Sequence, residues 1–360
     1  MLNKLDWYIL KNFLSTFLYA VILFTVISTV IDLSEHTDDF SHFNLEMGFV
    51  FSEFYSVFIP YIVSMLFPLF VFLSVIFFTS KMATRSEFIA ILAAGVSLKR
   101  ILFPYLIGSV FLALALWWAN DAFIPTANVK RTAFESKYFR TPDINVISRS
   151  IYMRIDSFSY CGIRYYDTSN RSGGGFFMER IKGNKIVYNM RADGIVWDTT
   201  KKKWRLSSVI ERNINPSNES VKYYTEMFKS FNFTPKDLKR DEYMKVRLTT
   251  AELNRMIFLE KLRGSETVNE LLLEKAHRAA TPISVIILTL IGAILACRRI
   301  RGGSGIHLAA GILICAVYIL ADRFSTIFST KGNLNPLVAA WLPNFVFGIL
   351  TVWLYKKAPK

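Results

Sequence analysis

The sequence predicts a polytopic α-helical membrane protein in which six transmembrane helices, arranged three plus three, flank a soluble all-β domain that is a sandwich, a jelly roll or an open barrel. Three observations predict this fold: six apolar segments of membrane length, about 150 polar and basic residues between the third and the fourth, and β-type runs inside that stretch. Each apolar segment is close to the roughly 17 to 25 residues that a helix needs to cross hydrocarbon. A soluble protein of this length would have to bury six long helices in one core, so membrane spans are the better interpretation.

The predicted spans form two triplets that bound the chain. The first triplet, in residues 1–125, comprises about 13–31, 56–78 and 101–124, and the second, in 282–360, comprises about 282–297, 306–325 and 336–354. The first segment is too long for a signal-peptide core, and the residues after it offer no small-residue cleavage site. We therefore expect it to remain as a helix.

Basic residues flank the predicted spans on one side of the membrane. They precede the first span, lie between the second and third and between the fourth and fifth, and follow the sixth: Lys4, Lys11, Lys81, Arg85, Lys99, Arg100, Arg298, Arg299, Arg301, Lys356, Lys357 and Lys360. The loop 32–55, on the opposite side, has six acidic residues and no Lys or Arg. Because cationic flanks stay in the cytoplasm, we expect a multi-pass membrane protein with both termini in the cytoplasm and the central domain on the outer side.

A short cytoplasmic helix is predicted between the second and third spans, at residues 86–95. Ser86 is a typical N-cap, Glu87 suits a helix start, and Gly95 can end the helix. Its apolar edge follows the i, i+3, i+4, i+7 spacing and consists of Phe88, Ile91, Leu92 and Gly95. A helix this short cannot cross the membrane, so it lies on the bilayer or in the groove of a partner; periodicity alone favours packing at the interface.

The central domain, residues 126–248, is predicted to be β structure. Runs rich in aromatic and β-branched residues alternate with turns such as 169–175, 182–184 and 199–203. The expected strands are 151–155, 158–166, 176–181, 185–191, 194–198, 204–212 and 221–231. Such a number of short strands indicates a sandwich, a jelly roll or an open barrel. Thr-x-x-Glu spacings at Thr249 and Thr267 then predict two connector helices in 249–281, which could act as a lever or as plain connectors.

Composition leaves open what the outer domain binds. The formal net charge is +15, and most of the excess lies in the central stretch. A basic surface there fits anionic envelope partners such as phosphorylated lipids, although a solvated basic face is an equal alternative. Three cysteines provide no disulfide framework.

No catalytic or metal-binding constellation is evident in the sequence. The four histidines lack metal-ligand spacing, and the glycine-rich segment 302–305 lacks the lysine of a phosphate loop, so a tight turn is expected there. Asp322 and Arg323 are expected near the outer end of the fifth span, where snorkelling or substrate contact would explain their charges. Because no phosphate loop is present, the energy must come from elsewhere if this protein moves something uphill.

Three motifs resemble one family, the lipopolysaccharide-export permeases LptF/LptG (YjgP/YjgQ). Residues 85–87 with 93–97 look like its coupling-helix motif, residues 5–9 are similar to its Leu-Asp-Arg-Tyr-Ile start with Trp7 for arginine, and residues 339–344 resemble its last span. The Leu-Asp-x-Tyr-Ile start resembles the LptG type more than the LptF type. The chain departs from the family at Leu92, where a polar residue is usual, and at Asp32 and Glu35, where basic residues are expected.

The resemblance implies a permease subunit of an ATP-driven exporter that extracts lipopolysaccharide from the inner membrane and passes it to a periplasmic β-jellyroll bridge. It implies a sister permease subunit, a single-span jellyroll partner (LptC-like) and a cytoplasmic ATPase dimer (LptB-like) that binds the ATP and Mg²⁺, with no cofactor on this chain. The implied ATPase-coupling residues are Ser86, Glu87, Phe88, Ile91, Leu92 and Gly95. Lipid headgroup contacts would come from the sister subunit or from Lys130, Arg131 and Arg323.

Two other classes of function remain open from the residues alone. A membrane-anchored envelope scaffold or sensor would use the six spans only to hold a lipid-binding β domain, and it would have no ATPase partner. An intramembrane enzyme acting on lipid-linked sugars would need acids or histidines at a membrane face. The candidates for that role are Asp32, Glu35, His36, Asp38 and Asp39.

Overall fold

The computed structural model describes residues 3–139, 146–147, 151–183, 185–214, 218–238, 244–263, 267–297, 304–332 and 334–358. They belong to two compact units. The helical unit comprises Met1–Arg140, Lys245–Leu253 and Asn269–Lys360, and the β unit comprises Thr141–Met244 and Asn254–Val268. Arg298, Arg299, Arg301 and Lys360, which contribute to the predicted cationic side, lie outside the described residues, as do Gly302 and Gly303.

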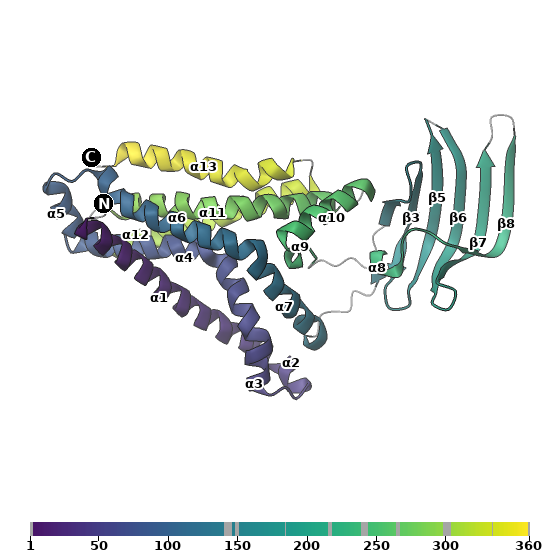
Figure 1. Cartoon of the computed structure of the whole chain (residues 1–360), viewed down its shortest axis with the longest axis horizontal. Coiled ribbons are helices and arrows are strands. Elements are labelled where there is room, and N and C mark those ends of the chain that lie inside the picture. The colour runs from purple at the N-terminus through teal and green to yellow at the C-terminus, as the bar shows by residue number, and fades with distance from the viewer. Residues whose placement is uncertain are drawn as a thin grey trace. The chain divides into compact units, whose positions relative to one another are not determined.

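Within the described residues, six helices are long and apolar enough to cross a membrane, three on each side of the β strands in the sequence (Figure 1). The long helices are α1 (Lys4–Glu35), α4 (Ser56–Thr84), α6 (Leu98–Trp118), α11 (Val268–Ala296), α12 (Ser304–Lys331) and α13 (Pro336–Lys357). The shorter ones are α2 (Thr37–His42), α3 (Met47–Val50), η1 (Phe51–Tyr55), α5 (Glu87–Ala93), η2 (Ala119–Phe123), α7 (Ile124–Tyr138), α8 (Pro235–Leu238), α9 (Met244–Arg247) and α10 (Thr250–Arg263). The predicted six-helix architecture is confirmed.

The third long helix continues beyond its predicted end at residue 124, because η2 and α7 extend it without a break to Tyr138. Pro125 ought to end an α-helix, since it donates no N–H and collides with the carbonyl of Asp121. The five residues of η2 form a π-helical turn around that carbonyl, and a wider turn gives the proline ring room. Helix α7 therefore lies within the range 126–248 that the sequence assigned to the β domain, and the helical unit extends to Arg140.

Hydrogen bonds around Pro343 connect the three long helices of the second triplet, α11, α12 and α13. A proline at this position leaves the carbonyl of Ala339 without its helical N–H donor, and the Ser325 hydroxyl of α12 donates to that carbonyl at 2.6 Å. The next residue, Asn344, donates from Nδ2 to the Ala280 carbonyl of α11 at 2.7 Å and accepts from the Tyr318 hydroxyl of α12 at 3.0 Å. The motif at 339–344 thus connects three helices through side-chain hydrogen bonds.

The β unit is one antiparallel sheet with the order β1-β4-β5-β6-β7-β8 and with β2 and β3 joined through β5. The strands are β1 (Val146–Ile147), β2 (Ile151–Arg154), β3 (Ser159–Ile163), β4 (Tyr165–Asp167), β5 (Ser172–Lys182), β6 (Lys185–Asp198), β7 (Lys203–Ile214) and β8 (Glu219–Lys229). The two strands expected at 185–191 and 194–198 are one strand, β6. The turn expected at 169–175 is shorter, because Gly173 and Gly174 belong to β5 and pair with β4 and β6. Gly174 leaves room for a neighbouring side chain, since a Cβ at this position would lie 2.4 Å from the Tyr165 hydroxyl.

The four long strands β5 to β8 are irregular at neighbouring positions, and we call this line across the sheet the crease. The regular pairing of β5 to β8 is interrupted at one aligned set of positions, Gly175, Asp193, Ser208 and Thr225, besides a separate register shift between β5 and β6 at Arg180 and Ile181. Gly175 and Ser208 have positive φ angles of 67° and 51°, respectively, a backbone region that bends a strand. We call the part with 176–182, 185–192, 209–214 and 219–224 the first arm, and the part with 172–174, 194–198, 203–207 and 226–229 the second arm.

The two arms enclose one apolar core, which gives the unit its jelly-roll character. Met190 and Val209 of the first arm and Trp204 and Leu206 of the second arm are all at most 1 % exposed. The segment after β8 closes over this core, where the Phe233 carbonyl accepts from the Trp204 indole N–H at 3.0 Å. A single sheet folded along the crease therefore makes a closed interior.

Candidate functional site

The short helix α5 lies between α4 and α6, at the end of the helical unit where both chain termini are found (Figure 1). It runs from Glu87 to Ala93, slightly shorter than the predicted 86–95. Both flanking residues turn the chain: Ser86 has φ 61° and Gly95 has φ 81°. Ser86 precedes the helix in a left-handed conformation, so it begins α5 by a sharp turn and not by the extended geometry of an ordinary N-cap.

The predicted apolar edge of α5 faces its own bundle. Phe88 is 1 % exposed and belongs to the core cluster that also contains Ile9 of α1 and Leu98 of α6. Ile91 and Leu92 pack against the same cluster. Burying one Phe side chain contributes roughly 1.5–3 kcal/mol, so this edge attaches α5 firmly to the bundle and is not its free surface.

The free surface of α5 is the opposite one, which sequence reasoning missed. Its residues are exposed and mostly small: Ile89, Ala90, Ala93, Ala94 and Gly95. Ile89 is 45 % exposed, and a Cβ added to Gly95 would meet nothing within 4 Å. For Ile89, Ala90, Ala93 and Ala94 the signal was present, since these positions are those left over by the i, i+3, i+4, i+7 edge. Gly95 was predicted on that edge and is exposed instead. The structure therefore leaves one flat, apolar face of α5 accessible.

The two sequence motifs at this end of the molecule meet in space. The Tyr8 hydroxyl of α1 donates to Glu87 Oε2 at 3.1 Å, although the residues are 79 positions apart. Arg85 Nη1 lies 3.8 Å from Glu87 Oε1, an exposed pair that contributes at most about 1 kcal/mol. Glu87 therefore joins α5 to the start of α1.

A second polar contact fixes the start of α1 to α6. Arg100 Nη2 donates to Asp6 Oδ2 at 2.5 Å, and the backbone N–H of Asn3 donates to the same oxygen at 2.7 Å. The Asp6 side chain is only 3 % exposed, whereas that of Arg100 is 37 % exposed. Because a buried carboxylate is costly without partners, Asp6 holds the first turn of α1 against α6.

A polar hollow of about 290 Å³ lies beside this junction, between α1 and α4. Its lining includes Tyr8, Asn12, Thr16, Lys81 and Arg85, together with Glu87. The hollow places Glu87 at the meeting point of two long helices and α5.

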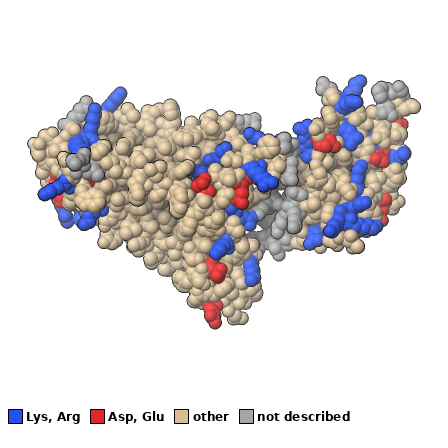
Figure 2. All heavy atoms as spheres, in the orientation of Figure 1, with Lys and Arg blue, Asp and Glu red and all other residues tan. Residues whose placement is uncertain are grey.

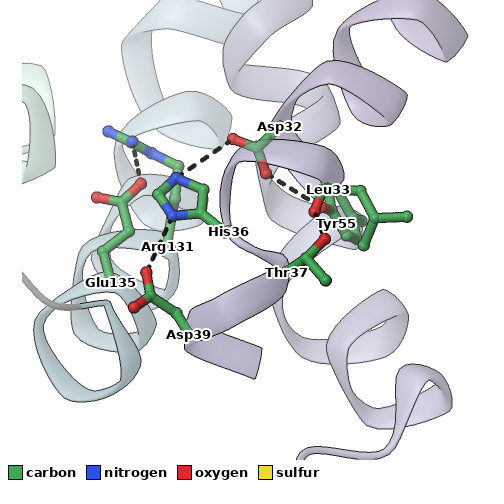
Figure 3. Close-up of polar contacts among 8 residues, drawn as sticks. All are labelled: Asp32, Leu33, His36, Thr37, Asp39, Tyr55, Arg131 and Glu135. Carbon is green, nitrogen blue, oxygen red and sulfur yellow. Dashed lines mark hydrogen bonds and ion pairs between the residues drawn. The ribbon is translucent and has the colours of Figure 1, made fainter. Parts of the chain in front are cut away.

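At the opposite end of α1, a charged cluster joins α1, α2, η1 and α7 (Figure 3). Asp32 accepts from the Tyr55 hydroxyl at 3.1 Å, and His36 Nδ1 lies 3.2 Å from Asp39 Oδ2. The His36 ring also stacks on Phe139 with ring centroids 3.8 Å apart. In the structure, Asp32, Asp39 and His36 make contacts that hold helix ends together.

The three candidate headgroup contacts occupy different environments. Arg131 is 6 % exposed and donates to Glu135 at 2.5 Å and to Asn128 at 3.1 Å. Its guanidinium also lies 3.8 Å from the centre of the Tyr61 ring. Lys130 and Arg323 are exposed. The structure thus brings Arg131 into the cluster of Figure 3 and leaves the two other cations on the surface.

Among the described residues, no group of three or more His, Cys, Asp or Glu side chains could hold a metal ion. His277 of α11 faces Asp322 of α12 at 3.8 Å, which gives the acid of the fifth long helix a partner within the bundle.

Comparison with known proteins gives one result for the whole chain. The model of the family described as lipopolysaccharide export system permease LptF/LptG matches residues 7–357. No curated protein matches the chain. The matched range contains both helix triplets, α5 and the β unit, so the similarity concerns the full architecture and not one motif.

Proposed function

Because the chain belongs to the lipopolysaccharide export permease family LptF/LptG, we propose that it is a permease subunit of an ATP-driven exporter. In this proposal it extracts lipopolysaccharide from the inner membrane and passes it to a periplasmic β-jellyroll bridge. The family match supports the export role, and the six apolar helices support a multi-pass membrane protein. The ATP-driven step and the bridge are the parts that experiments must test.

We propose that the α5 end of the bundle faces the cytoplasm and that the β unit lies in the periplasm. Lys81, Arg85, Lys99 and Lys356 are all at the α5 end, and cationic flanks stay cytoplasmic. Figure 2 shows Lys and Arg side chains gathered at that end of the helical unit and an almost uncharged band beside them. Such a band is what a bilayer requires.

The free face of α5 is the observation that carries the proposal. A short helix that is fixed to the bundle by Phe88 and to α1 by Glu87, and that presents Ile89 and Ala93 outward, is suited to fill the groove of a partner. We propose that the partner is a cytoplasmic ATPase dimer that binds the ATP and Mg²⁺. Nucleotide-driven closure of that dimer would move α5 and, through Glu87, the inner end of α1.

We also propose a sister permease subunit as a membrane partner. The central residues of α1 have exposed apolar side chains, and those of α12 do so as well. Examples are Leu18, Ile22 and Val26 in α1 and Leu313 and Leu320 in α12, each at least 54 % exposed. Two largely uncovered helices fit a paired assembly with a lipid path, to which a single-span jellyroll partner would add its own domain. The Leu-Asp-x-Tyr-Ile start favours the LptG-type subunit.

The test is the charge reversal Glu87→Arg in a strain that depends on this chain for export. We expect export to be lost and the ATPase to stop co-purifying in mild detergent, while the amount of protein in the membrane is unchanged. Glu53→Arg, an exposed acid far from α5, is the matched control and should export normally. Unaffected export by Glu87→Arg would remove the coupling role. If no ATPase co-purifies even with the unmodified chain, a membrane-anchored scaffold with a lipid-binding β domain is the better function.

A further inference from the structure

Lys229 and Tyr188 meet although the pairing of the sheet would place them far apart. Lys229 pairs with Trp204, which in turn pairs with Trp197 of β6. Tyr188 lies nine residues away from Trp197 on that strand, about 30 Å in a flat sheet, yet Lys229 Nζ lies 3.1 Å from the Tyr188 hydroxyl. The fold along the crease makes this contact possible, so the contact joins the second arm to the first.

The contact is part of a chain of polar groups across the open side of the folded sheet. The Tyr188 hydroxyl donates to Glu211 Oε1 at 2.6 Å and accepts from the Lys229 ammonium group. Arg180 lies beside the same ring, with its guanidinium carbon 5.9 Å from the ring centre. We call Lys229, Tyr188 and Glu211 the clasp.

The clasp is a concentrated electrostatic site. Its three side chains are all half-buried. Burial lowers the pKa of Lys229, and the nearby Arg180 lowers it further, whereas the Glu211 carboxylate opposes this change. Two cations thus share one carboxylate, which leaves a local positive charge that favours an additional anion.

The interior behind the clasp is apolar and closed. Met190, Trp204 and Leu206 fill it and are fully buried. An alkyl chain can therefore enter only when the two arms separate. A charged entrance in front of an apolar interior is complementary to an amphiphile that has an anionic head and a hydrocarbon tail.

We propose that the clasp is a latch that keeps the folded sheet shut, and that the phosphate group of an amphiphile opens it. In the open state, the phosphate oxygens would replace Glu211 and Tyr188 as partners of Lys229 and Arg180, because Arg and Lys bind phosphate through strong charge-assisted hydrogen bonds. The arms then separate and the tail enters the interior. This inference rests on the proposed function, since it assumes that the β unit receives a phosphorylated lipid.

The test measures the separation of the arms in the purified full chain in detergent. Spin labels are placed at Lys182→Cys in the first arm and Lys203→Cys in the second, both exposed positions, while the three native cysteines are buried. Double electron–electron resonance then reports the distance between the labels. We expect dodecyl phosphate to lengthen and broaden this distance in the otherwise unmodified chain, and dodecanol to leave it unchanged.

Variants of the clasp separate a latch from an ordinary surface contact. Lys229→Met should give the long distance without ligand and no further response to dodecyl phosphate. Glu211→Gln should respond at about a tenfold lower concentration, because the phosphate no longer competes with a carboxylate. Lys201→Met removes an exposed lysine of the same unit that lies over Phe228 and should behave like the parent. A short distance in Lys229→Met, equal to that of the parent, would overturn the latch.

The source of the phosphate is tested in the same way. Inorganic phosphate at the concentration at which dodecyl phosphate acts should leave the arms closed; if it opens them equally, the ligand is free phosphate and the proposal for an amphiphile is wrong. Export measured in cells keeps this inference distinct from the proposed function. If the arms of Lys229→Met stay closed and this variant still supports export, only the latch is contradicted. If dodecyl phosphate opens the arms of the parent chain but Glu87→Arg still exports, only the coupling mechanism is contradicted.

Discussion

Replacing Asn344 with leucine removes both interhelical hydrogen bonds that its side chain makes, to the Ala280 carbonyl and from the Tyr318 hydroxyl. Asn344 is 4 % exposed, and leucine is similar in size, so the change in packing is small. Hydrogen bonds between membrane helices contribute about 0.6 kcal/mol on average and up to about 1.7 kcal/mol. With the Tyr318 hydroxyl left without this acceptor, we expect the free energy of unfolding to fall by about 1–3 kcal/mol.

The measurement is the unfolding of the purified protein in mixed micelles, titrated with a denaturing detergent and followed by circular dichroism. Tyr318→Phe should give part of the loss, and the double variant should lose less than the sum, because the two side chains share one hydrogen bond. Phe345→Leu, at a side chain that is 68 % exposed, is the control and should change the stability by less than about 0.5 kcal/mol. If Asn344→Leu is no less stable than Phe345→Leu, the three-helix join at Pro343 does not hold the triplet.

Three further predictions concern α5, the outer cluster and the β core. Phe88→Ala should lower the free energy of unfolding of the bundle by about 3–5 kcal/mol. Ile89→Asp should instead leave the unfolding midpoint unchanged and prevent co-purification of the ATPase. The reverse pattern would mean that the buried and free faces of α5 are misassigned. Arg131→Met should reduce the amount of folded protein, because Glu135 then keeps a half-buried charge without its partner. The control Lys130→Met should leave this amount unchanged. Equal amounts of the two variants would contradict a structural role for Arg131. Burial raises the pKa of Cys161 to about 12, so at pH 8 its thiol should react with a maleimide only after unfolding, and rapid labelling of the folded chain would show that the β core is open.

Helix periodicity and hydropathy were sufficient to locate the membrane spans, because length and apolar content decide whether a segment can cross a bilayer. They did not predict that the third helix continues past Pro125 to Tyr138. The π-helical turn that accommodates this proline depends on one shifted hydrogen-bond register and has no sequence pattern of its own. In the β unit, Ser208 adopts a positive φ without being a glycine, so the crease could not be predicted from turn residues.

The candidate site shows a different limit. The spacing of Phe88, Ile91 and Leu92 correctly grouped them on one face of a helix, yet spacing does not say which surface covers that face. Both a partner's groove and the chain's own bundle satisfy the same apolar edge. The contact between Tyr8 and Glu87 is also invisible in the sequence, since 79 residues separate the two, and only the packing of α1 beside α5 brings them together.

The contacts of α1 explain how a displacement at α5 could reach the far end of the bundle. Its first turns are held by Asp6 and Tyr8, and its last turn by Asp32, which accepts from Tyr55. Between these ends, the helix of 32 residues is about 48 Å long, and one side of its middle is uncovered by this chain. In the proposed coupling, α1 moves as a unit when Glu87 moves. The cluster in Figure 3 would then receive the displacement, and through the stack of His36 on Phe139 it would act on the residue that follows the end of α7.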